Sequence, residues 1–211
     1  MFATPSLQVR AAALLALLVF SYPLLRNFDL VPYDKAVEVA AEYTNHRRVR
    51  SLSARLHTEQ TMIERIKERP LFGWASAGRS ALRDPSTGRL ATVYDGYWII
   101  CLSNRGSIGY ITVFGLLLWP IVTAMRAMPR IRAPGDRVVL GVLSLMIAIS
   151  AFDLIPNSTV EGFYTMFSGA LAGLVPGILR EQRKNRPKDS DEPSVLPDSE
   201  QARVSKLLSS S

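Results

Sequence analysis

The sequence predicts an all-α integral membrane protein with four transmembrane helices and a large, partly helical extracytoplasmic segment between the first two. Hydrophobic residues make up 48% of the 211 residues, and they are gathered in blocks that carry almost no charge. A helix needs about 20 apolar residues to cross a bilayer core of about 30 Å. The blocks that approach or meet this length are residues 11–25, 107–125, 138–156 and 160–179.

The first block, residues 11–25, could instead be the apolar core of a signal peptide, because the preceding residues 1–10 carry a positive charge. A signal peptide ends in a small-x-small cleavage site. Residues 21–26 read SYPLLR and offer no such site. We therefore expect a retained membrane helix, with residues 1–10 as a cytoplasmic N-terminus.

The positive charges indicate how the helices are oriented, because short loops rich in Lys and Arg stay in the cytoplasm. Residues 126–137 form a short loop with four arginines, and residues 180–188 are basic directly after the last helix. The connection at residues 157–159 carries no positive charge. Both termini are therefore expected in the cytoplasm, and the polar tail at residues 180–211 is expected to be disordered.

The segment at residues 26–95 then lies outside the cytoplasm, although it is rich in arginine. It is about 70 residues long, and loops longer than about 60 residues largely escape the charge rule. Residues 31–42 and 52–69 have helical spacing, and the second of these is the clearer amphipathic helix. We expect this segment to carry the chemistry of the protein.

Several kinds of site are excluded by the composition. Cys101 is the only cysteine, so the chain has no intrachain disulfide and no cysteine metal cluster. His46 and His57 are the only histidines, and neither has a metal-ligand partner three or four residues on. The net charge of +7 is explained by membrane topology rather than by nucleic acid. We predict no metal, no cofactor and no nucleic-acid partner.

The amphipathic helix at residues 52–69 places Arg55 and Glu59 on or beside its apolar stripe, which is formed by Leu52, Leu56, Ile63 and Ile66. His57 lies on the opposite, solvated side. Arg55 and Glu59 are four residues apart and could simply pair with each other. Alternatively, Arg55 faces an anionic ligand and Glu59 orients it, since a guanidinium can donate two parallel hydrogen bonds to a phosphate.

The stretch IKERPLFGWASAGRS, residues 66–80, ends this helix at Pro70, because the residue before a proline is pushed out of helical geometry. Gly73 and Gly78 then permit backbone conformations that other residues avoid. We expect the glycines to bend the chain so that Arg79 returns toward Arg55. The aromatic residues of the stretch, Phe72 and Trp74, are expected to contact membrane lipid at the bilayer interface.

Residues 96–102 are expected to lie at the outer membrane surface or to dip into it, with an interruption at residues 104–106 before the membrane-spanning part begins. Asp95 directly precedes this helical run and is well placed as its N-cap. Asp153 is expected at the membrane interface, near the outer end of the third helix.

Small residues on one helix face allow close approach of another helix. The fourth helix has such a face, formed by Gly169, Gly173 and Gly177, which serves either as a dimer seam or, as we favour, to pack against another helix of the same assembly.

With these residues laid out, the chain resembles the O-antigen ligase and O-antigen polymerase superfamily of bacterial membrane glycosyltransferases. The resemblance covers residues 52–120. It is carried by Arg55 in a helix, the turn PLFGWA at residues 70–75, Asp95 before an apolar helix, and the GxxG pattern at residues 106–109.

The resemblance implies that a glycan is transferred from an undecaprenyl diphosphate carrier to a sugar hydroxyl, outside the bacterial cytoplasmic (inner) membrane, without a metal or a nucleotide sugar. It implies that Arg55 and Arg79 grip the diphosphate and that Asp95, where the ligases have a histidine, is the candidate base. Glu59 and Arg105 are supporting residues.

Three departures from the family bear on this reading. A carboxylate at position 95 is a weaker base than a histidine, since its ordinary pKa is near 4. This favours the polymerases or related exopolysaccharide enzymes over the lipid A ligases. Ala75 stands where the family turn usually has glycine. The chain corresponds only to the C-terminal half of the family, so a partner chain supplies the missing helices, the reading frame is truncated, or the chain is an inactive remnant. A non-catalytic membrane component of polysaccharide assembly is the alternative function.

Overall fold

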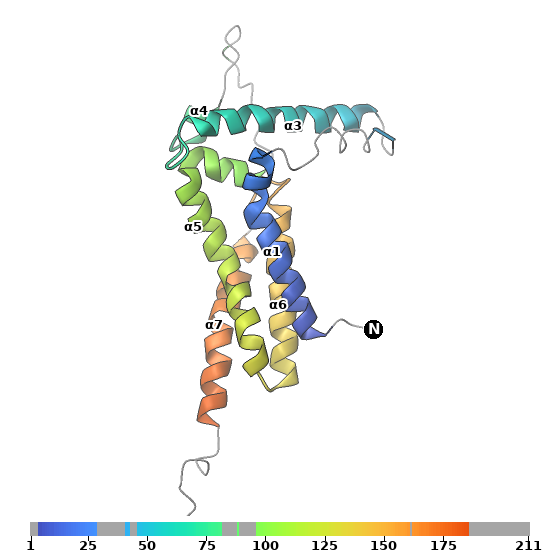
Figure 1. The fold of residues 1–211 in the computed structure, drawn as a ribbon, viewed down its shortest axis with the longest axis vertical. Coiled ribbons are helices and arrows are strands. Elements are labelled where there is room, and N and C mark those ends of the chain that lie inside the picture. The colour runs from blue at the N-terminus through green and yellow to red at the C-terminus, as the bar shows by residue number, and fades with distance from the viewer. Residues whose placement is uncertain are drawn as a thin grey trace, which may run out of the picture. The chain divides into compact units, whose positions relative to one another are not determined.

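The computed structural model describes residues 4–28, 41–42, 46–81, 88, 96–160 and 162–185, and this described part contains helices, turns and loops but no strand. Figure 1 shows the arrangement of the elements. In chain order they are α1 (Pro5–Asn27), α3 (His46–Lys67), α4 (Ala77–Ser80), α5 (Tyr97–Ala127), the 3-10 helix η1 (Met128–Arg130), α6 (Pro134–Asp153) and α7 (Gly162–Lys184).

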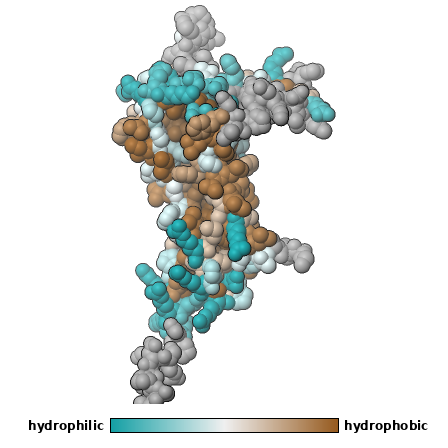
Figure 2. Space-filling model, viewed as in Figure 1, coloured by the Kyte–Doolittle hydropathy of each residue, from teal (hydrophilic) through white to brown (hydrophobic). Residues whose placement is uncertain are grey.

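Four of these helices are long and apolar enough to cross a membrane, and they confirm the expected number of spans. They are α1, α5 together with η1, α6 and α7. The first begins at Pro5, six residues before the apolar block at residues 11–25, because the helix also includes polar residues ahead of that block. Figure 2 shows hydrophobic side chains over the middle of the visible face and hydrophilic ones at the α3 end. The all-helical architecture indicates a multi-pass membrane protein.

Helices α1 and α6 run side by side in the same direction, and α5 runs in the opposite direction beside them (Figure 1). At the start of α6, Arg137 donates a hydrogen bond of 2.7 Å to the Ser6 hydroxyl of α1. Both helices bury small side chains, which allow close approach of a neighbouring helix. These are Ala12 and Ala16 in α1 and Ala148 and Ala151 in α6.

Two prolines inside the membrane helices are compensated by hydroxyl groups from neighbouring helices. Pro23 has no N–H to give to the carbonyl of Val19, and the Tyr110 hydroxyl donates to that carbonyl at 3.1 Å. Pro120 likewise has no N–H for the carbonyl of Leu116, and the Ser168 hydroxyl lies 3.3 Å from it and 3.0 Å from the next carbonyl. Such pairing matters in a bilayer, because no water is present to satisfy a freed carbonyl.

Helix α3 lies across the end of the bundle where α1 ends and α5 begins (Figure 1). Met62 and Ile63 are buried beneath it, in agreement with the predicted apolar stripe for Ile63. His57 is exposed, as expected. A partly buried ion pair fixes α3 to the end of α1, with 2.7 Å between Arg26 Nε and Glu59 Oε1.

The helix α5 contains the expected interruption, at Gly106, where φ is +66° and ψ is −170°. In a regular helix the N–H groups of residues 107 and 108 would donate to the carbonyls of Ser103 and Asn104. Instead, Ser107 and Ile108 donate to the carbonyls of residues 70 and 71, at 2.8 and 3.3 Å. The two carbonyls freed by the kink accept from the N–H groups of residues 74 and 75, each at 2.8 Å.

The turn at residues 70–75 therefore substitutes for two missing hydrogen bonds of α5. Both partners need glycine at the contact. A Cβ on Gly106 would lie 2.2 Å from the Leu71 carbonyl oxygen, and a Cβ on Gly73, whose φ is also +66°, would lie 2.6 Å from the Ser103 carbonyl oxygen. The second residue of the turn with positive φ is Ala75, at +67°. This is the position at which the resemblance leads one to expect glycine.

Trp74 holds the turn against the end of α3. Its indole Nε1 donates to the Arg65 carbonyl at 3.3 Å. The guanidinium carbons of Arg65 and Arg69 lie 3.7 and 4.5 Å from the centre of its rings. Leu71 and Phe72 are exposed at the tip of the turn and Trp74 is partly covered. The placement of Phe72 and Trp74 at a bilayer interface stays a prediction.

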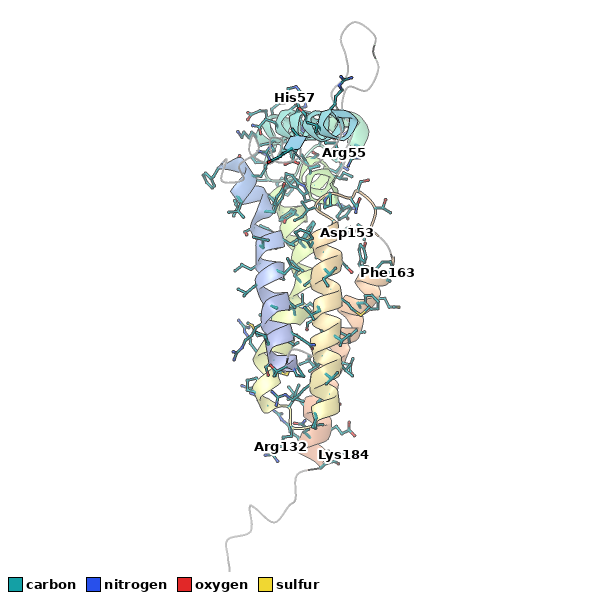
Figure 3. All side chains as sticks on the ribbon, turned by 90° about the vertical axis from the view of Figure 1, so that its right-hand side faces the viewer. Arg55, His57, Arg132, Asp153, Phe163 and Lys184 are labelled. Atoms are coloured by element: carbon teal, nitrogen blue, oxygen red, sulfur yellow. The ribbon has the colours of Figure 1, made fainter. Side chains whose placement is uncertain are left out.

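The basic connection at residues 126–137 lies at the opposite end of the bundle from α3, as Figure 3 shows for Arg132 and Arg55. This agrees with the predicted separation of the basic loop from the α3 segment, whereas the side of the membrane on which each lies stays a prediction. Helix α7 buries one face, at Tyr164, Ser168, Leu171, Val175 and Ile178.

Within the described part of the chain, nothing packs on the glycine face of α7. A Cβ added to Gly169, Gly173 or Gly177 would have no neighbour within 4 Å in the described part of the chain. The packing partner that we favoured for this face is therefore not another described helix of this chain.

Candidate anion site at the α3 end of the bundle

A polar cavity of about 280 Å³ lies where α3 passes over the connection between α6 and α7. Figure 3 shows Arg55 of α3 and Asp153 of α6 at this end of the bundle. Besides Pro156, the residues that line the cavity are Arg55, Asp153, Asn157, Ser158, Thr159 and Tyr164. We call it the polar cavity below.

The carboxylate of Asp153 is held by two donors, one from the connection that follows it and one from α7. The Asn157 side-chain amide donates to one oxygen at 2.6 Å, and the Tyr164 hydroxyl donates to the other at 3.0 Å. The backbone N–H of Asn157 also donates to the Asp153 carbonyl at 3.1 Å. Asp153 thereby sets the shape of the cavity wall as well as contributing its charge.

The wall is also tied to the start of α5. The backbone N–H of Tyr97 lies 3.0 Å from the Leu154 carbonyl oxygen and 2.8 Å from that of Asn157. Gly96, the N-cap of α5, is buried, and a Cβ there would lie 2.2 Å from the Ile155 carbonyl oxygen. The approach of the two backbones therefore requires glycine at position 96.

The side chains of the cavity suit a phosphate group. Arg55 is exposed toward it and carries a planar, permanently charged fork of donors that matches phosphate oxygens. The hydroxyl groups of Ser158 and Thr159 can each donate one hydrogen bond. The carboxylate of Asp153 lines the same cavity, where it can accept a proton beside the bound anion.

The predicted site residues fall into separate places. Arg55 lines the polar cavity, whereas Arg79 lies in α4 and is not among the residues that line it. The Glu59 carboxylate contacts Arg26, so the prediction that it orients Arg55 stays untested. Arg105, directly before the kink, donates to the Tyr97 hydroxyl at 3.4 Å.

Asp95 lies outside the described residues, so its role as base stays a prediction. Its role as the N-cap of α5 is not supported, because the N-cap is Gly96 and no side chain caps the helix there. The helical pattern at residues 31–42 also lies almost entirely outside the described residues.

Sequence reasoning missed Asp153, Asn157 and Tyr164 as members of a site. Asp153 lies at the end of its helix, as expected. A charged residue there is close to the membrane interface, so the sequence alone does not mark it as functional. The signal that could have identified the group is spacing. An acidic residue at a helix end, followed four residues later by an amide, offers a local side-chain pair.

In the described ranges, no group of three or more His, Cys, Asp or Glu side chains could hold a metal ion. No family model, curated protein or solved structure matches this chain. The function is therefore inferred from the chain's own residues.

Proposed function

We propose that this protein acts in surface polysaccharide assembly in the bacterial inner membrane, by binding an undecaprenyl diphosphate-linked glycan and taking part in its transfer to a sugar hydroxyl. The observation that carries the proposal is the polar cavity. It brings an arginine, a carboxylate and two hydroxyl groups together at the end of a bundle of membrane-spanning helices. The family resemblance at residues 52–120 supports the same reaction.

The proposed chemistry uses the cavity as follows. The bond between the anomeric carbon of the glycan and the diphosphate oxygen breaks, and a new bond forms from that carbon to the acceptor hydroxyl oxygen. Arg55 stabilises the charge that develops on the departing diphosphate, as fixed donors do best in a partly dehydrated site. The proton of the acceptor goes to a carboxylate, for which Asp153 and Asp95 are the candidates.

The remaining assignments follow from the same proposal. Arg79 assists with the diphosphate from α4, and Glu59 and Arg105 support the α3 and α5 segments. A partner chain supplies further membrane helices around the carrier. In this orientation the α3 end of the bundle faces away from the cytoplasm and the residues near Arg132 face it.

The test is replacement of the chromosomal gene by variants, with polysaccharide chain length read from a gel of the surface polymer. Arg55→Ala should abolish chain growth and Arg55→Lys should restore it only in part, since lysine lacks the planar fork. His57→Ala is the matched control, because His57 lies on the same helix and is exposed. Normal chain length in the Arg55→Ala strain, at normal protein levels, would reject the assignment.

A second candidate function is a non-catalytic membrane component that assembles with the polysaccharide machinery. It is favoured by the open face of α7, where Gly169, Gly173 and Gly177 meet no described atom. This candidate predicts that Gly173→Leu disrupts co-purification with partner proteins. It also predicts that Arg55→Ala and Asp153→Asn leave polymer linkage intact, which is the result that separates the two functions.

A further inference from the structure

A second cavity, of about 350 Å³, lies between α5 and α7. Helix α5 contributes Tyr97, Phe114 and Leu117, and α7 contributes Thr165 and Ser168. The cavity also borders Leu116, whose side chain is 72% exposed on the outside of the bundle. It is therefore accessible from the side, at the level of membrane-spanning helices. We call it the apolar cavity.

The polar groups around the apolar cavity are already engaged. The Thr165 hydroxyl donates to the Gly162 carbonyl at 2.9 Å, and the Ser168 hydroxyl donates to the Leu117 carbonyl at 3.0 Å. The Tyr97 hydroxyl accepts from Arg105. What the lining offers to a guest is thus methyl groups and aromatic rings, which favour a hydrocarbon chain over a polar ligand.

The apolar and polar cavities share one wall. Along the connection from α6 to α7, neighbouring residues line different cavities: Asp153 lines the polar one and Leu154 the apolar one. Thr159 likewise lines the polar cavity and Val160 the apolar one. At the start of α7, Tyr164 lines the polar cavity and Thr165 the apolar one. The hydrogen bonds from the Tyr97 N–H to this connection hold the wall in place.

We propose that the apolar cavity binds the first isoprenoid units of the carrier lipid whose diphosphate lies in the polar cavity. This inference rests on the proposed function for the identity of the head group. The two cavities match the two halves of such a ligand, an anionic head beside Arg55 and a branched hydrocarbon chain beside Phe114 and Leu117. The open side at Leu116 lets the rest of the long chain pass out into the bilayer.

The test uses the full chain in nanodiscs and three probes: undecaprenyl diphosphate, phosphatidylglycerol and inorganic diphosphate. Binding of the two lipids is measured by native mass spectrometry and that of inorganic diphosphate by calorimetry. Val113→Trp fills the apolar cavity from α5, and Val160→Trp fills it from the connection. Val142→Trp is the matched control, because Val142 is exposed on α6 and lines neither cavity.

Both cavity-filling variants should weaken undecaprenyl diphosphate binding by about tenfold or more, the effect of about 1.4 kcal/mol of lost chain burial. Binding of inorganic diphosphate should stay within about twofold of the wild type, and Val142→Trp should change neither. The inference is overturned if both variants, folded by their melting temperatures, bind undecaprenyl diphosphate like the wild type. It is also overturned if phosphatidylglycerol binds as tightly and loses as much, since acyl chains then occupy the cavity.

Failure of the proposed function gives a different result. If Arg55→Ala leaves the binding of inorganic diphosphate unchanged while Val113→Trp still weakens the lipid, the head group does not bind at Arg55. The isoprenoid site then stands without the diphosphate assignment.

Discussion

Replacing Gly106 by alanine tests whether the kink in α5 and the turn at residues 70–75 depend on each other. The alanine Cβ would lie 2.2 Å from the Leu71 carbonyl oxygen, and φ at this position is +66° with ψ at −170°, a region used almost only by glycine. The chain can relieve both problems only by moving the turn away. We therefore expect Gly106→Ala to release the turn and allow α5 to become a regular helix.

The expected cost follows from the bonds that are exchanged. Release breaks four backbone hydrogen bonds between the turn and α5, and the straightened helix regains two. The net loss of two bonds costs about 1–3 kcal/mol, at about 0.5–1.5 kcal/mol each. Loss of the contacts of Trp74 with Arg65 and Arg69 adds about 1–2 kcal/mol. The free energy of unfolding should therefore fall by about 2–5 kcal/mol in total.

The assay is equilibrium unfolding in mixed micelles, followed by tryptophan fluorescence. Trp98→Phe and Trp119→Phe in the background leave Trp74 as the only reporter. Gly115→Ala is the matched control, because a Cβ there has no neighbour within 4 Å and should stabilise the same helix by about 1 kcal/mol. If Gly106→Ala unfolds at the wild-type denaturant concentration with unchanged Trp74 emission, the coupling between turn and kink is refuted.

Three further substitutions test other contacts by the same unfolding assay. Ala75→Gly should stabilise the protein by about 1 kcal/mol, because it removes the strain of a left-handed alanine. Tyr110→Phe should destabilise it by about 1 kcal/mol through loss of the hydroxyl that serves the carbonyl freed by Pro23. Glu59→Gln should destabilise it by about 2 kcal/mol, because it removes the charge that faces the buried guanidinium of Arg26 in a partly buried ion pair.

Each of these three has its own control. Ala81→Gly, at a residue with φ of −65°, should give no stabilisation, and equal gains at both positions would contradict the strain argument. Tyr110→Phe combined with Pro23→Ala should cost less than the sum of the two single changes, since the alanine restores the missing N–H. Glu64→Gln breaks an exposed ion pair with Lys67 and should change the free energy of unfolding by less than about 0.5 kcal/mol. An equally small change for Glu59→Gln would show that the pair between Arg26 and Glu59 contributes little to stability.

The membrane helices and the interruption of α5 could be predicted because their signals are local. A run of about 20 apolar residues is enough to specify a span, and Pro70 together with Gly73 is enough to end α3 near Lys67. The stripe that contains Ile63 was also visible, since it depends only on helical spacing. In each case the physical cause lies within a few residues of its effect.

The contacts that bring distant segments together could not be predicted in this way. Arg55 and Asp153 lie almost a hundred positions apart, and nothing near either residue indicates that both line one cavity. The exchange of hydrogen bonds between residues 70–75 and the kink depends on how α3 lies across the bundle. From the sequence, Arg26 is only the first residue after the apolar block at residues 11–25, and nothing near it indicates that it pairs with Glu59.

The pairing of prolines with hydroxyl groups has a consequence for how this sequence can change over evolutionary time. Pro23 is tolerated because Tyr110 is present, and Pro120 because Ser168 is present. Loss of either hydroxyl would leave a carbonyl unsatisfied in hydrocarbon, whereas loss of the proline first would carry little penalty. Related sequences should therefore lose each proline before the hydroxyl that compensates for it, and should acquire the hydroxyl before the proline. Pro23 with Tyr110 and Pro120 with Ser168 should thus vary as two pairs.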